Sequence, residues 1–258
     1  MKKKRKVKIK YGNICLVLFV LAGIGCLVYF CLNAKGGAIF DNSAEYTPIF
    51  AKNTSDILPK DIDYGDIEQY KKAVMLEQRD GVTYFTVAGH EMLLVNKQYS
   101  IPADFGGENA EASAALCRLY AACEADGLPM YTVSGYRSYS TQENIYNNFV
   151  NTRGYEAAEM VSAQPGHSEH QTGLAFDVNG SDEGTVLATA FGNTAEFAWL
   201  NEHMADYGFI LRYPEGGTGS TGYAYEPWHI RYVGEDLARL IKQSGLTVEE
   251  LAATMTAE

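Results

Sequence analysis

Short runs of alternating hydrophobic and polar residues predict strands along this chain from residue 82 onward. The runs at 82–87 and 92–96 are separated by a short segment containing Gly89, which is typical of a β-hairpin. The other predicted strands are 130–134, 174–178, 209–213 and 228–233.

Hydrophobic positions spaced three and four residues apart predict helices between these strands. The predicted helices are 109–126, one that begins near Ser140, 194–207 and 235–243. Ser140 and Glu143 have the spacing of a capping box at the start of the second helix. Helices and strands do not alternate strictly, so the pattern favours an α+β domain, with a small antiparallel sheet flanked by helices, over a doubly wound parallel fold.

The run from Ile14 to Leu32 contains no charged residue and is long enough to cross a hydrocarbon core of about 30 Å. Seven basic side chains precede it within residues 1–10, and basic residues concentrate on the cytoplasmic side of a first membrane helix. We therefore expect one N-terminal transmembrane helix, with the rest of the chain outside the membrane. The alternative is a cleaved signal peptide, whose apolar region is usually shorter and ends in small residues.

These patterns predict four consecutive regions of the chain. They are a basic cytoplasmic segment over 1–13, a transmembrane anchor over 14–33, a stalk or linker over 34–80 and a folded domain over 81–250.

The charge of the chain argues against nucleic acid as a partner. The net charge is −11 even though the first ten residues are strongly basic, so the remainder is more acidic still. Binding to a phosphate backbone depends on neutralising phosphates with Lys and Arg. The cysteines predict neither a disulfide nor a zinc finger, because Cys117 and Cys123 point to different sides of the predicted 109–126 helix.

Two segments, 165–178 and 226–234, contain His170, Asp177 and His229. Two imidazoles and one carboxylate, with a fourth position left open, suit a catalytic zinc ion. Strand alternation in 174–178 places Asp177 on the face opposite Leu174, Phe176 and Val178.

Gly173 is expected to allow close backbone approach between His170 and Asp177. The alternative interpretation is that Asp177 caps a turn and His170 lies on a solvated loop.

Glu226 and Arg137 are the candidate catalytic side chains. Glu226 precedes His229 by three residues, and a carboxylate there can take a proton from a metal-activated water and return it. In a regular strand the two residues would face opposite ways, so this hypothesis requires a twist or bulge near Pro227. Arg137, between a predicted strand and helix, can pair with a carboxylate or stabilise an oxyanion, although a surface position is the alternative.

The segments 93–105, 134–142, 165–178 and 208–234 together resemble the VanY-type D-alanyl-D-alanine carboxypeptidases and their L,D-carboxypeptidase relatives. They include SxHxxGxAxD, from Ser168 to Asp177, with ExxH downstream. The resemblance implies an α+β fold like that of zinc D,D-peptidases and the Hedgehog signalling domain, so that the domain over 81–250 is a zinc carboxypeptidase domain. The residues that it implies are zinc ligands His170, Asp177 and His229, the base Glu226, Arg137 for substrate and transition state, and Gln142, Ser168 and Tyr213 in the substrate pocket.

One position departs from the family pattern. Many relatives carry a Lys where this chain has Gly217, which affects substrate preference but not the hydrolytic residues. His167 is an alternative metal ligand beside His170, and His203 in the 194–207 helix is expected to be structural.

The resemblance implies a zinc enzyme that removes the C-terminal D-alanine from peptidoglycan stem peptides. The predicted anchor places this enzyme in the bacterial cell membrane, with its catalytic domain outside. Two alternatives stay open: an L,D-carboxypeptidase acting on tetrapeptide stems, and a non-catalytic wall-binding module that has kept the fold. The motifs do not separate D,D- from L,D-cleavage.

Overall fold

The structure is a computed structural model and describes residues 76–256. The predicted cytoplasmic segment, the anchor and nearly all of the stalk lie outside the described residues. Within 76–256, none of the helices has the length and apolar character needed to cross a membrane.

Two small antiparallel sheets form the framework. The first contains β1 (Glu77–Arg79), β2 (Val82–Val87) and β3 (His90–Leu94) in that order, so the predicted hairpin is confirmed. The second contains β4 (Tyr131–Ser134), β5 (Ala175–Asn179), β7 (His229–Tyr232) and β6 (Phe209–Leu211), in the order β4-β5-β7-β6. The α+β class is confirmed, with two sheets where one was expected, and β1 lies in the segment predicted as stalk.

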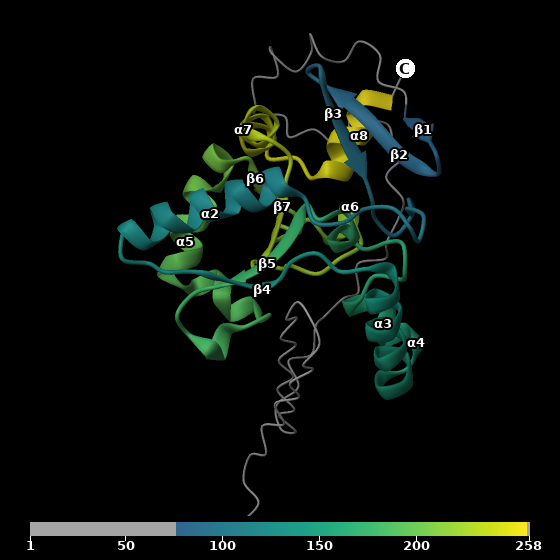
Figure 1. Cartoon of the computed structure of the whole chain (residues 1–258), viewed down its shortest axis with the longest axis horizontal. Coiled ribbons are helices and arrows are strands. Elements are labelled where there is room, and N and C mark those ends of the chain that lie inside the picture. Colours follow the sequence, from purple (N-terminus) through teal and green to yellow (C-terminus); the bar gives the residue numbers. More distant parts are fainter. Residues whose placement is uncertain (1–75, 257–258) are drawn as a thin grey trace, which may run out of the picture. The chain divides into compact units, whose positions relative to one another are not determined.

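Helices flank both sheets (Figure 1). The α-helices are α2 (Ala110–Ala125), α3 (Tyr139–Arg153), α4 (Tyr155–Val161), α5 (Ala195–His203), α6 (Thr218–Thr221), α7 (Glu235–Ser244) and α8 (Val248–Thr256). The 3-10 helices are η3 (Glu169–Thr172), η4 (Glu183–Thr185), η5 (Thr189–Asn193) and η6 (Met204–Tyr207).

The sequence prediction missed α4, α6 and α8. The predicted 194–207 helix is in fact α5 followed by η6.

The predicted capping box of α3 is wrong. The helix begins at Tyr139, and its N-cap is Ser138, whose hydroxyl accepts the backbone N–H of Thr141. Ser138 has an extended backbone, as an N-cap requires, whereas Ser140 already lies inside the first turn. Both serines lie close to the helix start in sequence, and only the backbone conformation distinguishes them.

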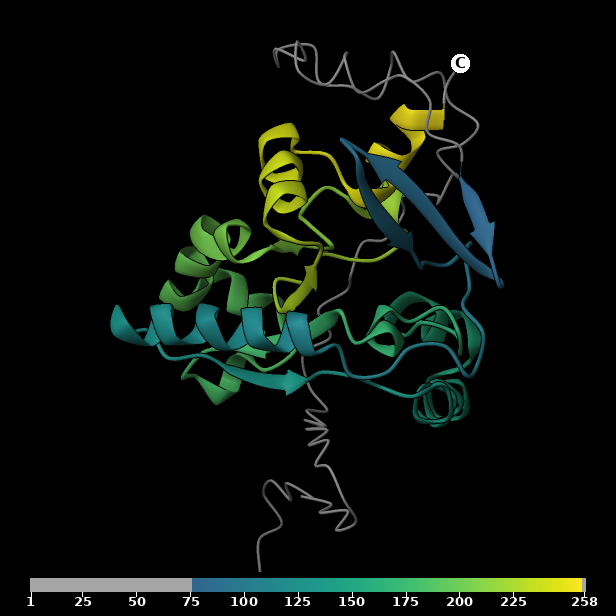
Figure 2. The same cartoon turned by 45° about the horizontal axis from the view of Figure 1, so that its top comes forward.

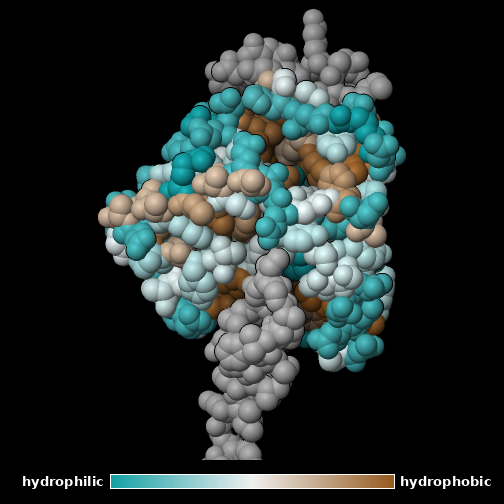
Figure 3. Space-filling view, viewed as in Figure 1, coloured by the Kyte–Doolittle hydropathy of each residue, from teal (hydrophilic) through white to brown (hydrophobic). Residues whose placement is uncertain are grey.

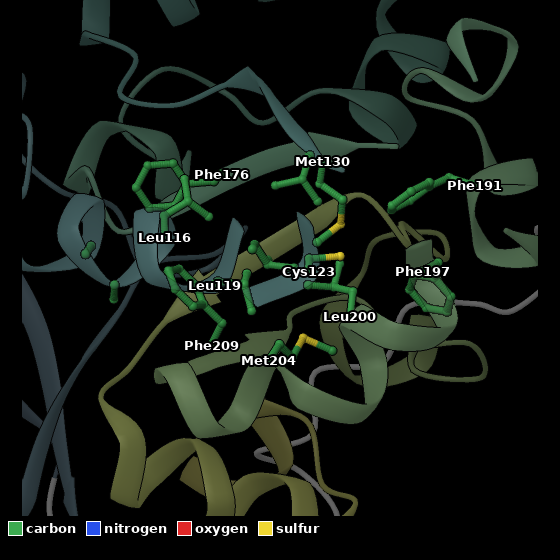
Figure 4. Close-up of a cluster of buried hydrophobic side chains, with 14 residues drawn as sticks. Leu116, Leu119, Cys123, Met130, Phe176, Phe191, Phe197, Leu200, Met204 and Phe209 are labelled. Carbon is green, nitrogen blue, oxygen red and sulfur yellow. The ribbon is translucent and has the colours of Figure 1, made fainter. Parts of the chain in front are cut away.

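The larger core covers one face of the four-stranded sheet. Phe176 and Ile230 point from β5 and β7 toward α2 and α5, as strand alternation predicts. The labelled side chains of this core are Leu116, Leu119, Cys123, Met130, Phe176, Phe191, Phe197, Leu200, Met204 and Phe209 (Figure 4). Cys117 and Cys123 are both free thiols, which confirms that they do not bridge.

A second core joins β2 and β3 to α7 and α8. Leu94, Leu237 and Leu251 are fully buried in it, and Figure 2 shows α8 beside the three-stranded sheet. Because Leu251 and Ala252 belong to this core, the folded unit continues past the predicted boundary at residue 250. Polar residues cover most of the visible surface, with small hydrophobic patches between them (Figure 3).

A buried ion network lies where the second core meets the four-stranded sheet. The guanidinium of Arg212, which is 0% exposed, donates to Glu169 at 2.8 Å and to Glu249 of α8 at 2.8 Å. Arg231 of β7 lies 3.0 Å from Glu169, and Asn96 donates to Glu249 at 3.0 Å. The network therefore connects η3, the end of β6, β7 and α8 through charged groups that water does not reach.

We predict that Glu249→Ala strongly destabilises the fold. Removing one partner of a buried ion pair leaves the other charge uncompensated and typically costs about 3–5 kcal/mol. Chemical denaturation followed by circular dichroism measures the change. The matched control is Glu235→Ala, which removes a partner of the exposed Arg239 and should leave the midpoint nearly unchanged. Equal midpoints for the two variants would contradict the prediction.

Candidate metal centre

Asp177 and His229 are directly opposite each other on neighbouring strands. They are register partners in the β5–β7 pair, so their side chains share the sheet face away from the larger core. Asp177 Oδ1 lies 3.2 Å from His229 Nδ1, and both side chains are nearly buried. The alternative interpretation of Asp177 as a turn cap is therefore wrong, since the residue lies within a strand.

His170 reaches the same place from η3, just before β5. Its Nε2 lies 3.3 Å from Asp177 Oδ2, and its Nδ1 lies 2.8 Å from the carbonyl oxygen of Gly135. A carbonyl can only accept, so Nδ1 carries the proton and the Nε2 lone pair faces Asp177. His170 is 4% exposed, so it does not lie on a solvated loop.

Two glycines allow the segment that carries His170 to pack closely. Gly173 ends η3 with φ +71°, and a Cβ there would lie 2.0 Å from the carbonyl oxygen of Gly107. A Cβ on Gly106 would lie 1.9 Å from the carbonyl oxygen of Gln171. Gly173 thus permits close approach to the 106–107 segment, a contact that the sequence did not suggest.

The three side chains fit a tetrahedral metal ion. Their candidate ligand atoms all lie within 4.8 Å of one another, and all three side chains are buried. Ligands about 2.0–2.1 Å from a tetrahedral zinc ion lie roughly 3.3 Å apart. The 3.3 Å between His170 Nε2 and Asp177 Oδ2 matches this spacing, and His229 Nδ1 lies 3.2 Å from the other oxygen of the same carboxylate, Oδ1. A set of two imidazoles and a carboxylate leaves one position of the tetrahedron for water or substrate.

Glu226 lies beside this cluster without joining it. Its Oε2 is 3.9 Å from His229 Nδ1, and its side chain keeps 18% exposure. The predicted twist near Pro227 is instead a turn, in which the backbone N–H of His229 donates to the carbonyl of Glu226 at 3.1 Å. Strand β7 begins only at His229, so no strand register forces the two side chains apart. Burial raises the pKa of Glu226 to about 7, near the value that suits a general base.

Arg137 points toward the metal cluster from the turn after β4. Its Nη2 lies 3.6 Å from Asp177 Oδ2 and donates to Ser134 at 3.0 Å, while Nη1 donates to Gln142 at 2.7 Å. Gln142 is 1% exposed, and its amide also donates to Ser162 and to the carbonyl of Ala163. The alternative of a surface arginine is wrong, and in the structure Gln142 holds Arg137 in place.

The other residues singled out from the sequence fall in different places. Tyr213 is buried, with its ring centroid 4.8 Å from that of His229, and Ser168 is buried immediately before η3. His167 donates through Nδ1 to the carbonyl of Asn96 at 2.8 Å and is outside the metal cluster. His203 packs against Trp199, consistent with a structural residue.

Glu169 is the residue of the site that sequence reasoning missed. Its Oε2 lies 3.5 Å from His229 Nε2, and neither atom has another hydrogen-bond partner among the described residues. A carboxylate next to a metal-binding imidazole keeps the proton on the nitrogen that faces it. In His229 that nitrogen is Nε2, so Nδ1 is left free for a metal. The available signal was an acidic residue next to His170 in a segment otherwise poor in charge.

The pKa values of the metal-free ligands follow from these contacts. Burial lowers the pKa of His170. Burial would also lower the pKa of His229, but Asp177 and Glu169 outweigh it and raise the pKa to about 9. Burial acts to raise the pKa of Asp177, but His170 and His229 hold it below its usual range. The carboxylate is thus ionised at neutral pH, while His229 carries a proton that a metal must displace.

An antiparallel α+β fold that holds two imidazoles and a carboxylate beside a separate glutamate and an arginine defines the class of mononuclear metallopeptidases. A family model described as VanY, D-alanyl-D-alanine carboxypeptidase, matches residues 107–235, which include all the site residues above. The chain belongs to the VanY D-alanyl-D-alanine carboxypeptidase family.

Three similar proteins illustrate the relationship. The protein YodJ of Bacillus subtilis is 37% identical over 195 residues, 68% of this chain and 71% of YodJ. The L,D-carboxypeptidase DacB from Streptococcus pneumoniae is 39% identical, with a TM-score of 0.61 over 69% of this chain and 95% of DacB. A mutant of the vancomycin resistance D,D-pentapeptidase VanY from the VanB-type cassette, in complex with Zn(II), is 36% identical, with a TM-score of 0.53 over 62% of this chain and 97% of that one.

We predict that zinc binding at pH 6.5 releases at least one proton per ion, from His229 and in part from Glu226, whose pKa is about 7. His229 is protonated there because its pKa is about 9, whereas the pKa shifts of His170 and Asp177 leave both ready to bind. One released proton corresponds to an apparent affinity that rises about tenfold per pH unit. Calorimetry of zinc binding to the metal-free protein, in buffers of different ionisation enthalpy, measures the release. No release at pH 6.5 would show that His229 is neutral before the metal binds.

Proposed function

We propose that this protein is a zinc-dependent carboxypeptidase that removes the C-terminal D-alanine from peptidoglycan stem peptides. The observation that carries the proposal is the convergence of His170, Asp177 and His229 with Glu226 beside them, in a chain of the VanY family. The Zn(II) complex of the VanY neighbour supports zinc as the ion. A solved complex of the 36% identical VanYB with D-alanine-D-alanine supports the substrate class.

In this mechanism His170 Nε2, His229 Nδ1 and Asp177 would hold the zinc ion. When bound there, zinc would supply Lewis acidity, which polarises a carbonyl group and makes water more acidic. Glu226 takes the proton from the attacking water and returns it to the leaving amine. Its raised pKa of about 7 makes both transfers feasible near neutral pH.

Arg137 stabilises the negative charge that develops on the carbonyl oxygen. Gln142 and Ser134 hold its guanidinium on the side of the cluster next to Asp177, so little reorganisation is needed during the reaction. Tyr213 packs against His229 and fixes the plane of that ring. Ser168 is buried immediately before η3, the helix that carries His170.

L,D-cleavage of tetrapeptide stems is the second candidate. DacB, an L,D-carboxypeptidase, has a higher identity and TM-score than the VanY neighbour and is covered to 95% by this chain. The same metal, base and arginine serve either reaction. The choice depends on how the residue before the scissile bond is accommodated.

We also propose that residues 14–33 anchor the protein in the bacterial cell membrane, with the catalytic domain on the outer side. The uncharged run after a basic segment supports this topology, and peptidoglycan is also external to the membrane. The acidic balance of the chain argues against nucleic acid as a further partner.

We expect the zinc-loaded protein to release one alanine from a pentapeptide muropeptide, as followed by mass spectrometry. A chelator should abolish the release and added zinc should restore it. Release from the tetrapeptide alone would assign the enzyme as an L,D-carboxypeptidase. No release from either peptide, with zinc bound, would favour the wall-binding module.

Glu226→Ala should lower turnover by about a hundred- to ten-thousandfold, which is the usual contribution of a general acid–base. Zinc content should not change, because Glu226 is not among the candidate ligands. The control is Glu215→Ala, which removes an exposed glutamate on the same connection. Unchanged turnover in Glu226→Ala would remove Glu226 from the mechanism.

Arg137→Ala should lower kcat by roughly a hundred- to a thousandfold with a smaller change in KM, because the arginine acts mainly on the transition state. Arg137→Lys should recover only part of the rate, since an ammonium lacks the planar fork that contacts Gln142 and Ser134. Arg153→Ala, at the exposed end of α3, is the control. A rise in KM with unchanged kcat would instead assign Arg137 to ground-state binding.

A further inference from the structure

A stack of aromatic rings leads away from His229. The ring centroid of Tyr213 lies 4.8 Å from that of the imidazole, and the two rings are tilted by 45°. The ring centroid of Tyr223 lies 4.6 Å from that of Tyr213, with a tilt of 35°. Both tyrosines are only 5% exposed, so the three rings have little room to turn independently of one another.

The outer end of the stack meets a cation. The ammonium of Lys97 lies 4.7 Å from the centre of the Tyr223 ring, within the range of a cation–π interaction. The same ammonium donates to the backbone carbonyl of Glu159, in α4, at 2.6 Å. Lys97 thus joins the outer ring of the stack to the backbone of α4.

Packing alone fixes the ring of Tyr223. Its hydroxyl is buried without a hydrogen-bond partner among the described residues. No hydrogen bond of the side chain therefore sets the orientation of the ring, which depends on its neighbours Tyr213 and Lys97. Tyr213 has a cation of its own, since the guanidinium of Arg212 lies 4.9 Å from its ring centroid.

The backbone around Lys97 is held by its neighbour Asn96. The side-chain oxygen of Asn96 accepts the backbone N–H groups of Gln98 at 2.9 Å and of Tyr99 at 3.0 Å. The backbone N–H of Asn96 donates to the carbonyl of Tyr99 at 3.0 Å. These bonds close a tight turn, so the side chain of Lys97 leaves the backbone from one defined position.

The same turn is tied to other parts of the site. The side-chain amide of Asn96 donates to Glu249 of the buried ion network at 3.0 Å, and its backbone carbonyl accepts from His167 at 2.8 Å. His167 lies three residues before His170. The turn therefore contacts the segment that leads to one metal ligand and, through Lys97, the stack that ends at another.

This turn lies outside the part of the chain that the family model matches, which begins at residue 107. It follows β3, the last strand of the three-stranded sheet, which ends at Leu94. The candidate metal ligands all come from the matched part of the chain. A segment that adjoins the three-stranded sheet thus reaches the surroundings of a metal ligand from outside that part.

We propose that Lys97 is a positioning residue of the metal centre, which holds the imidazole of His229 in place through Tyr223 and Tyr213. Contacts that orient a ligand change how tightly the ion is held, even though they do not touch it. The inference rests on the proposed function, which supplies the zinc ion and the reaction. It requires that loss of Lys97 weakens zinc binding and slows turnover without weakening the binding of substrate.

The test measures the metal without substrate. Competition with a chromophoric chelator gives the zinc affinity of the full chain, and the absorption spectrum of the Co(II)-substituted protein reports the arrangement of the ligands. The variants are Lys97→Met, which keeps the side-chain length but removes the charge, Lys97→Arg, Tyr223→Leu and Tyr223→Phe. Lys242→Met is the matched control, because Lys242 also donates to a backbone carbonyl but is exposed on α7.

Lys97→Met and Tyr223→Leu should each weaken zinc binding by about three- to tenfold, less than the roughly ten- to a hundredfold that is usual for a direct partner of a ligand. Both should shift the Co(II) absorption bands. Lys97→Arg should recover most of the affinity because it keeps a cation on the ring, and Tyr223→Phe because it keeps the ring. The double variant Lys97→Met with Tyr223→Leu should lose no more than Tyr223→Leu alone, since the lysine acts through the tyrosine.

Turnover separates positioning from substrate contact. With saturating zinc, Lys97→Met should lower kcat by about three- to tenfold and leave KM nearly unchanged. A rise in KM with unchanged zinc affinity would overturn the inference and assign Lys97 to substrate binding. A lower unfolding midpoint with an unchanged Co(II) spectrum would also overturn it, since the lysine would then only stabilise the fold.

Two further results would contradict the inference: unchanged zinc affinity in Lys97→Met, and fully additive losses in the double variant. Lys97 is half-buried, so Lys97→Met serves as the test even where Tyr223→Leu does not fold. Zinc affinity and the Co(II) spectrum do not depend on a substrate. A protein that shows the expected changes in both but releases no D-alanine would refute the proposed function and leave this inference intact.

Discussion

The pairing of Arg212 with Glu169 and Glu249 is the interaction on which the site depends most. It holds η3 against the end of β6 and the start of α8, so that a segment with no sheet partner stays in one position. His170 lies in η3 next to Glu169, and Glu169 also faces His229. The charges that stabilise this part of the fold therefore also hold the segment of His170 in place and face the imidazole of His229.

The position of the network explains why the four-stranded sheet has two unlike faces. One face is apolar and packs against α2 and α5, and the other carries Asp177, His229 and Arg231. A buried polar face is tolerated only when its groups are paired. Arg212 and Arg231 balance Glu169 and Glu249, while Asp177 lies between two imidazoles, so the polar side chains aligned on this face can be buried together.

Much of this arrangement could be predicted from the sequence. The alternation around Phe176 was enough to place Asp177 on the polar face, because a strand fixes side-chain direction by a local rule. The turn that carries Glu226 could not be predicted, since it depends on where β7 begins, and the pattern of 228–233 suited a strand throughout. Ser138 and Ser140 are both suitable N-cap residues, so the sequence alone could not show which of them begins α3.

The sequence offered only a weak signal for Glu169, its acidic side chain next to His170. Its partners Arg212 and Arg231 are distant along the chain, and no local pattern indicates that three charged side chains will be buried together. The same holds for α8, whose place in the core depends on contacts with β2 and β3 rather than on its own sequence.

The order in which the chain is synthesised has a consequence for this enzyme. Glu249 bonds to Asn96 across 153 positions, and Arg212 bonds to Glu169 across 43. Contacts between such distant segments form late, because long loops must close before they contribute stability. A chain that has emerged only as far as β7 already contains all three metal ligands, but it lacks the helix that secures the loop of His170. The ligands are thus made before the scaffold that orients them, and hydrolytic activity would begin only once α8 has docked.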